Sequence, residues 1–524
     1  MNNEHWKNLN RRDFLKYSLL AAGAATLPGM TGCATPGRNV PKLDYSKTFI
    51  LSNCNVIDVV TGAIKKNASV TINNGKISSI TTGQSEKAPG AVVIDMDNKY
   101  LTPGLIDAHC HSTISPVFGM SLLDLLKHSK QQKQNYISSV ESGVTTLRDM
   151  GSFPGMLSHF MNGIKNDSFP GPRVIYCNSM LNIKGSHPEV PPSDVNMFAV
   201  PASWFIGMVM NNFDDTKEME KCLKKNAEGA SFVKLTMDNK SVFCKQDKSI
   251  PVYTNEQLDL IFKFSEENNL PVAVHHHYKY GFERALKYPI HSLEHIVSDT
   301  VLSDEAILKM KDKNISIVPT ATVGQSFLME EAFYKVPKEY RTDFIDHEVE
   351  VRNAYFKHEA HNHCDPYLHQ TNLDMLQNYK ILGWNKLWSK KKFLVDPHLY
   401  YGMVKYGSEN LKKMREAGVL IGCGIDAGMP FCYFGGMYRE LEIYARLGFS
   451  NLEILQSATI NNAKILKIED LTGTVEVGKS ADLVAYEINP LEDITALRRP
   501  SQVFREGKMM FSGKDLVADG KMTA

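Results

Sequence analysis

Two histidines spaced two residues apart, His109 and His111, end the run Tyr100-Leu-Thr-Pro-Gly-Leu-Ile-Asp-Ala-His109-Cys-His111. Along a β-strand, alternate side chains share a face. One strand would therefore present two imidazoles to one cavity, which is one way to bind a metal ion. An isolated pair of this kind is more often two polar residues at a strand end. The further candidate ligands downstream favour the metal site.

Lys234 lies near the end of the apolar segment Ala230-Ser-Phe-Val-Lys-Leu235. A lysine buried at a strand end is costly unless it is neutralised or paired. Carbamylation by carbon dioxide would turn the amine into an anionic ligand that bridges two metals. Alternatively, the side chain extends to solvent at the rim of the fold. The residues alone leave these two interpretations open.

Three further candidates follow strand-like segments. In Pro271-Val-Ala-Val-His-His-His277, a period of two places His275 and His277 on one face and His276 on the other. His295 follows Ser-Leu-Glu, and Asp426 ends Ile-Gly-Cys-Gly-Ile-Asp, where glycines allow close backbone approach. Each residue alone would be read as structural, but their common position at strand ends predicts a shared site.

The middle of the chain alternates short β-rich segments with helical patterns, which indicates βα units and a parallel sheet. We expect strands at 101–109, 143–149, 173–178, 231–236, 271–276, 290–295, 315–319 and 419–425. Eight such units predict an α/β fold with a distorted (β/α)8 TIM barrel over residues 101–470. In that fold, active sites lie at the C-terminal ends of the strands, where the candidate ligands fall.

Two β-rich segments flank the barrel region, residues 47–100 and 471–524. We expect them to form one small, discontinuous β-sandwich from both ends of the chain. Between the last two barrel strands, an insertion at about 323–410 has helical patterns at 344–356 and 373–382. It contains His347, His358, His361, His363, Cys364 and His369. These side chains form either an auxiliary metal site or a polar, solvated lid, and their spacing favours the lid.

Residues 1–33 are expected to form an export signal rather than part of the fold. Asn10-Arg-Arg-Asp-Phe-Leu-Lys16 resembles the twin-arginine signal, and the apolar run 17–27 is too short to span a bilayer. Met30-Thr-Gly-Cys33 resembles a lipobox, which predicts a lipid on Cys33 and attachment to a membrane. The alternative is a plain cleaved signal with an incidental cysteine.

Composition excludes several classes of protein. The 524 residues carry a net charge of +1, with 43% hydrophobic and 22% charged residues, as in globular proteins. There is no basic stripe interleaved with aromatic residues, so we expect no nucleic-acid partner. The nine cysteines are scattered without a CxxC pair, which argues against a disulfide framework. The oligomeric state stays open, and a homo-oligomer is compatible with the sequence.

Together these motifs resemble the amidohydrolase superfamily, in its imidazolonepropionase-like branch with prolidase- and dipeptidase-type members. The similar segments read PGLIDAHCH, GVTTLRDMG, VAVHHH, SLEH, GIDAG, SATINNAKIL, GTVEVGKSADLVAYEINPL and VFREGK. The resemblance covers nearly everything from about 48 to 512 and is weakest at 323–410, where the family usually has a shorter connection.

The resemblance implies a ligand set for two divalent metal ions, with zinc as the expected metal. His109 and His111 would bind the more buried ion, and His275 and His295 the second. A carboxylated Lys234 would bridge the two ions. A hydroxide shared by both ions would then attack an amide carbonyl.

The resemblance also implies roles for the remaining site residues. Asp426 would bind the first metal and carry the proton to the leaving nitrogen, and His187 would stabilise the developing oxyanion. His277 and Tyr278 are secondary candidates for substrate contacts. For His187 the alternative is an ordinary loop histidine.

Two details bear on the subtype of enzyme. Deaminases and true imidazolonepropionases of this superfamily typically have a glutamate three residues after the strand-five histidine and lack the bridging lysine. Here Tyr278 occupies that position and Lys234 is present, which favours the two-metal, amide-hydrolysing type.

Arg148 and Asp149, after the second strand, are expected to be a structural pair below the barrel rim.

The sequence thus predicts an exported, metal-dependent hydrolase of amide bonds, periplasmic or membrane-anchored in a bacterium. Its expected substrates are small amides, namely dipeptides or N-acyl amino acids. One alternative is a hydrolase of cyclic amides or lactones, which the same hydroxide would serve. Another is a non-catalytic, metal-binding lipoprotein. A full ligand set with a proton carrier argues against the last alternative.

Overall fold

The computed structural model describes residues 48–83, 90–116, 122–189, 209–241, 249–328, 336–378, 397–513 and 522–523. The expected export signal, including Cys33, lies outside these residues. In the part of the chain that is described, no helix combines the length and the apolar character needed to cross a bilayer.

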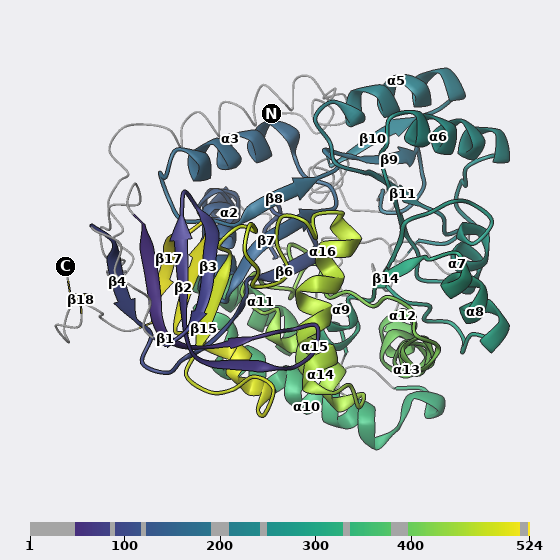
Figure 1. Ribbon diagram of the computed structural model, residues 1–524. Coiled ribbons are helices and arrows are strands. Elements are labelled where there is room, and N and C mark those ends of the chain that lie inside the picture. Colours follow the sequence, from purple (N-terminus) through teal and green to yellow (C-terminus); the bar gives the residue numbers. More distant parts are fainter. Residues whose placement is uncertain are drawn as a thin grey trace.

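Two parallel sheets supply seven of the barrel strands (Figure 1). One contains β6 (Leu105–Cys110), β7 (Val144–Asp149) and β8 (Arg173–Tyr176), and the other β11 (Val233–Thr236), β12 (Val272–His275), β13 (Ser292–Glu294) and β14 (Ser316–Val318). The backbone N–H of Ser231 donates to the carbonyl of Tyr176, 2.9 Å away, and so joins β8 to the segment leading into β11. The strand boundaries agree closely with the sequence expectation.

The eighth strand position differs from the prediction of a regular strand at 419–425. The segment pairs through isolated bridges, Ile421 with Ile317 and Ala427 with Cys110. Hydrogen bonds nevertheless close the barrel, because Ala108 N donates to Cys423 O at 2.9 Å and His111 N to Ala427 O at 2.7 Å. The segment lies so close to β6 that a Cβ at position 424 would be 2.7 Å from His109 N. Glycine is therefore required there.

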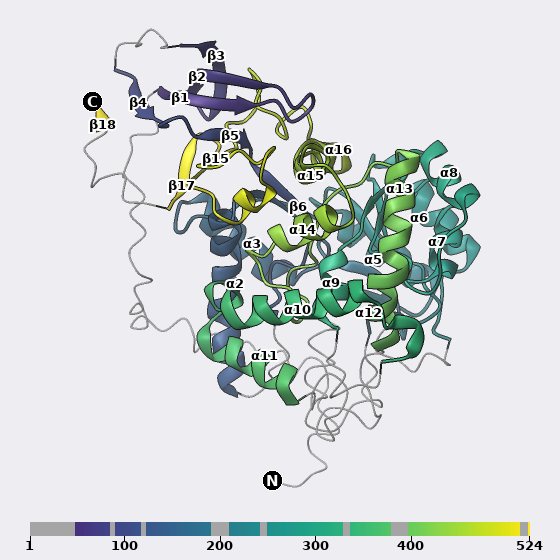
Figure 2. The same ribbon diagram turned by 90° about the horizontal axis from the view of Figure 1, so that it is seen from below.

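Helices follow the strands and cover the barrel (Figures 1 and 2). They are α2 (Leu122–Glu141), α3 (Pro154–Lys165), α5 (Thr216–Ala227), α6 (Asn255–Glu267), α7 (Lys279–Ala285), α8 (Asp304–Asp312), α9 (Ala321–Ser326), α12 (Pro397–Gly402), α13 (Ser408–Ala417), α14 (Tyr438–Arg446), α15 (Asn451–Ala458) and α16 (Ile460–Leu466). Local sequence sets several of their starts. Thr254 and Gln257 form a capping box at α6, as do Ser450 and Glu453 at α15. A small parallel pair, β9 (Met180–Ile183) and β10 (Met210–Phe213), accompanies the barrel.

Strands from both ends of the chain meet in a second unit, as predicted. They are β1 (Phe49–Ile57), β2 (Ile64–Asn73), β3 (Lys76–Thr82), β4 (Val92–Asp95), β5 (Tyr100–Pro103), β15 (Leu483–Tyr486), β16 (Gln502–Arg505), β17 (Lys508–Ser512) and β18 (Met522–Thr523). Instead of two sheets, they form a single mixed nine-stranded sheet. The reason is the length of β1, whose first half pairs with β4 and whose second half pairs with β5.

The insertion between strands seven and eight contains α10 (Asp343–His358) and α11 (Pro366–Asn378), near the helices expected at 344–356 and 373–382. The expectation of a solvated lid is wrong for its described part. Tyr355, Phe356, Cys364 and Leu368 are all buried in the main hydrophobic core. Their removal from water ties the insertion to the barrel. Among the described residues, the histidines of this segment form no group suited to a metal ion.

Candidate metal centre

His109 near the end of β6 and His111 just after it both face Asp426, which lies on the neighbouring segment. His109 Nε2 lies 3.5 Å from Asp426 Oδ1, and His111 Nε2 lies 3.2 Å from the same oxygen. The period-two expectation is thus confirmed for this pair of side chains. The three residues with suitably close ligand atoms in this region are His109, His295 and Asp426, all buried. They form the first group of candidate ligands.

A second group joins β12 to the end of β13. Single ligand atoms of His275, His277 and His295 all lie within 4.8 Å of one another. The rings of His275 and His277 are 4.7 Å apart, so these two side chains share a face, whereas His276 points elsewhere and contacts Glu294 O through Nδ1 at 3.1 Å. His277, assigned to substrate from the sequence, thus lies among the candidate metal ligands.

The charge of Lys234 acts on histidines of both groups. Its side chain is 1% exposed, and its Nζ has no hydrogen-bond partner among the described residues. Burial lowers the pKa of Lys234 to about 8. Its charge in turn lowers the pKa of His109 and of His275. Lys234 is therefore a buried amine inside the barrel and not a rim lysine that extends to solvent.

The histidines are electrically suited to bind a cation. Burial lowers the pKa of His109 to about 4 and that of His187 to about 3, and it lowers the pKa of His295 well below the usual range. Neutral imidazoles have a lone pair to offer to a metal. Conversely, the pKa of Asp426 is lowered despite its burial, by the neighbouring His109 and His111. An anionic carboxylate among neutral imidazoles is a donor set that fits a divalent ion.

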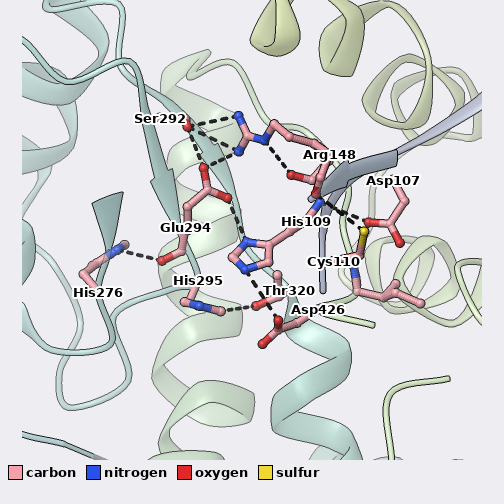
Figure 3. A network of polar contacts seen from close by, with 12 residues as sticks. Asp107, His109, Cys110, Arg148, His276, Ser292, Glu294, His295, Thr320 and Asp426 are labelled. Atoms are coloured by element: carbon pink, nitrogen blue, oxygen red, sulfur yellow. Dashed lines mark hydrogen bonds and ion pairs between the residues drawn. The ribbon is translucent and has the colours of Figure 1, made fainter. Parts of the chain in front are cut away.

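A buried ion pair supports the first group from below (Figure 3). Glu294 Oε2 accepts a hydrogen bond from His109 Nδ1 at 2.9 Å, and the other oxygen pairs with Arg148. Burial alone would raise the pKa of Glu294, but Arg148 and His109 lower this pKa to about 2. A carboxylate behind a histidine fixes the tautomer that directs Nε2 at a metal. Sequence reasoning missed Glu294. The signal that could have identified it is the presence of an acidic residue inside an apolar strand.

The expectation for Arg148 and Asp149 is only half right. Both are buried, but they lie on opposite faces of β7 and do not pair with each other. Arg148 contacts Glu294 and donates from Nε to Ala108 O at 2.8 Å. Asp149 instead accepts from Ser112 N at 2.8 Å and from Ser152 Oγ at 2.6 Å. Strand alternation is the reason for the separation.

Three further contacts that sequence reasoning missed hold the site histidines. Thr320 Oγ1 lies 2.7 Å from His295 Nδ1, and Gly151 O lies 2.7 Å from His111 Nδ1. Asp238 accepts from His277 N at 2.6 Å. Thr320 has positive φ and precedes α9, whose first two N–H groups donate to Glu440 at 2.8 and 2.6 Å. None of these residues belongs to a short ligand pattern, which is why spacing alone did not find them.

His187 is brought to the site, as the resemblance implied. Its ring stacks on that of His275 with centroids 4.4 Å apart, and its Nδ1 lies 3.0 Å from Ser241 Oγ. Tyr278 is buried and starts α7, and Lys240 Nζ lies 5.4 Å from its ring centroid. A substrate contact of Tyr278 stays a prediction.

Comparison with known proteins agrees with this geometry. The model of the amidohydrolase family matches residues 100–510, and that of the twin-arginine translocation signal matches 8–28, so the chain carries a signal for export by that pathway. Ochratoxinase of Aspergillus niger is 24% identical over 439 residues, covering 79% of this chain and 76% of the relative.

Solved structures share the fold. A Xaa-Pro dipeptidase with bound methionine superposes with a TM-score of 0.65 at 22% identity, covering 89% of this chain and all of the other. The A. niger ochratoxinase structure gives 0.63 at 22% identity, covering 90% and 96%. The family match spans well over half of the sequence and includes the barrel with its buried histidines and aspartate. The chain therefore belongs to the amidohydrolase family and is an enzyme that acts on carbon–nitrogen bonds.

Proposed function

We propose that this enzyme is a two-metal hydrolase of amide bonds in dipeptides or N-acyl amino acids. The observation that carries the proposal is Lys234, a buried amine without a hydrogen-bond partner whose charge acts on histidines of both ligand groups. An unpaired buried polar group costs about 1–3 kcal/mol. Carboxylation would convert this cost into a ligand that bridges two ions.

The remaining ligands combine members of the two groups with His111, whose Nε2 lies 3.2 Å from Asp426 Oδ1, in the assignment that the family resemblance implies. His109, His111 and Asp426 would hold one ion, and His275 and His295 the other. His275 Nε2 has no hydrogen-bond partner in the described structure, as expected for an atom that binds a metal. When bound, the ions supply a water that is deprotonated near neutral pH and polarise the carbonyl under attack. Zinc suits this mixture of nitrogen and oxygen donors.

Asp426 would carry out the proton transfer. Its carboxylate would take the proton of the attacking water and deliver it to the leaving nitrogen, which must leave as an amine. His187 would act on the carbonyl oxygen. If Ser241 Oγ donates to His187 Nδ1, the neutral ring carries its proton on Nε2 and can donate it to the developing negative charge.

The substrate class is supported by the names of similar proteins, among which are a Xaa-Pro dipeptidase, a prolidase and an ochratoxinase. A second candidate is the hydrolysis of cyclic amides or lactones. It is favoured by a partial similarity to imidazolonepropionase of Fusobacterium nucleatum, 29% identical over 104 residues, which covers 19% of this chain and 25% of that relative. Such enzymes carry a glutamate at the position of Tyr278, so this residue favours the first candidate.

Cellular location completes the proposal. The twin-arginine pathway exports folded proteins, which suits an enzyme that acquires its metals before export. A lipid on Cys33 would then anchor the mature protein to a membrane. Replacing Cys33 by alanine should release it from the membrane fraction, and retention there would refute the anchor.

The decisive experiment is a substrate screen with zinc-loaded protein. Dipeptides, N-acyl amino acids, cyclic amides and lactones are incubated with the enzyme, and product release is measured, with Asp426→Asn as the control. We expect turnover of linear amides that the control lacks. Turnover of the cyclic substrates alone would select the second candidate. Bound metal without turnover of any substrate would identify a metal-binding protein instead.

A further inference from the structure

The helix α10 of the insertion is fixed to the loop that supports His295. Glu348, on the buried face of α10, accepts a hydrogen bond from Gln325 Nε2 at 2.5 Å. Gln325 belongs to α9, which begins directly after Thr320, the residue whose hydroxyl lies 2.7 Å from His295 Nδ1. Helices α9 and α10 are in direct contact (Figure 2). One end of α10 is therefore anchored five residues from a contact of the metal centre.

Two turns further along, the same face of α10 contacts the loop that leaves strand eight. The ring of Phe356 packs edge to face on that of Phe431, with centroids 5.7 Å apart. Phe431 follows Asp426 by five residues. Since strands of the barrel end at the active-site side, α10 spans two loops that border the centre, one after strand seven and one after strand eight.

Arg352 lies between these two anchors. Residues four apart occupy one row on a helix, so Glu348, Arg352 and Phe356 form a row that begins at one loop and ends at the other. Arg352 is 1% exposed. Within the described residues, its Nε and Nη1 have no hydrogen-bond partner and its guanidinium is in no ion pair. Among the described residues, this guanidinium is therefore a buried group without a partner of opposite charge.

The neighbouring charges do not neutralise Arg352. Glu348 is already engaged by Arg446, through contacts of 2.5 and 2.8 Å, and by Gln325. A second buried arginine, Arg439, lies 4.1 Å over the ring of Tyr355 on the same helix and donates to Gln325 Oε1 at 2.7 Å. In the described structure, Glu348 is thus paired with residues other than Arg352. A buried charge without a partner is strongly unfavourable, and an anion would relieve it.

We propose that Arg352 binds the free carboxylate of the substrate and so makes the enzyme selective for N-acyl amino acids and dipeptides over neutral amides. The inference rests on the proposed function and adds the requirement for a negative charge beside the scissile bond. A guanidinium is well suited to this because its planar N–H groups match a carboxylate. The insertion would then be the element that sets specificity.

The test compares two amides that differ only in the carboxylate, N-benzoyl-L-phenylalanine and N-(2-phenylethyl)benzamide. In Arg352→Met, kcat/KM for the acid should fall by about 10²-fold, the range for a lost charge-assisted hydrogen bond. The neutral amide should change by less than about threefold. Arg352→Lys should recover part of the activity on the acid. Arg415→Met is the control, because it removes a guanidinium that pairs with Glu453 between α13 and α15 and should preserve the preference for the acid.

A binding measurement separates this inference from the proposed function. 3-Phenylpropionate should raise the melting temperature of the zinc-loaded wild type and of Arg415→Met but not of Arg352→Met, and 3-phenylpropanamide should raise none of them. This result stands even if neither amide is hydrolysed, in which case only the proposed function fails. Equal losses on both amides in Arg352→Met, or a carboxylate-dependent shift that survives in that variant, would overturn the role of Arg352.

Discussion

Glu294 and His295 are adjacent in the chain, yet both side chains contact His109. Glu294 Oε2 accepts from His109 Nδ1 at 2.9 Å, and the rings of His295 and His109 have centroids 4.7 Å apart. In a regular strand, neighbours point to opposite faces. His295 has a φ of 71°, so the chain leaves β13 in the left-handed region and turns the imidazole to the same side as the carboxylate. This single backbone conformation places a candidate ligand, His295, beside Glu294, the group that would orient another candidate ligand, His109.

That relationship predicts a large structural effect for Glu294→Gln. The substitution leaves Arg148 buried without its carboxylate, and breaking a buried ion pair from one side costs about 3–5 kcal/mol. We expect a lower urea midpoint of unfolding and weaker zinc retention. Glu453→Gln, which breaks the partly exposed pair with Arg415, should cost less than about 1 kcal/mol. Equal midpoints for the two variants would contradict the role of the buried pair.

If the proposed function is correct, metal content should be about two ions per chain when the protein is produced with ample zinc and bicarbonate, as expected for a two-metal hydrolase. Elemental analysis on a known protein concentration measures it. Chelation should abolish activity and zinc should restore it. A stable value near one ion with full activity would assign the enzyme to a one-metal class.

Replacing Lys234 by alanine should remove the bridging ligand. We expect loss of one metal and of activity, with partial recovery on addition of a short carboxylic acid that fills the space of the carbamate. Lys240→Ala is the control, since this lysine lies over the Tyr278 ring outside the two ligand groups. Unchanged metal content in Lys234→Ala would show that the amine is not a ligand.

Asp426→Asn separates metal binding from proton transfer. The amide keeps the shape and one ligand oxygen but cannot accept a proton. We therefore expect largely retained metal with kcat lower by about 10²–10⁴, the range for a lost general base. Metal content and turnover are measured on the same sample. Near-normal turnover in well-metallated protein would refute the proton transfer proposed for Asp426.

Export should depend on the paired arginines of the signal. Replacing Arg11 and Arg12 by lysine should retain the precursor inside the cell, because the twin-arginine motif is read by its own translocation machinery. Cell fractionation with immunoblotting measures the distribution. Lys7→Arg, which leaves the arginine pair intact, should be exported normally. Normal export of the double lysine variant would point to another route.

Local patterns were sufficient to predict much of this enzyme. The spacing of His109 and His111 and the alternation in the triplet at 275–277 depend only on strand geometry, and both are confirmed. The barrel strands were found because buried parallel strands are short apolar runs between helical patterns. The two β-rich flanks also predicted that the chain ends meet in one β unit, although this unit is a single mixed sheet and not the expected sandwich.

Only the tertiary structure decided how these parts act on one another. Arg148 could not be assigned to Glu294 from the sequence, because the two are 146 residues apart and pair only when β7 and β13 face each other in the barrel. Strand eight lies so close to β6 that position 424 has room only for glycine, and the insertion is buried because α10 packs on an apolar surface. Sequence fixes which side chains a strand or helix presents on each face, since that follows from local backbone geometry. Long-range packing decides which faces meet, and it decides which charge, such as that of Arg352, has no partner among the described residues.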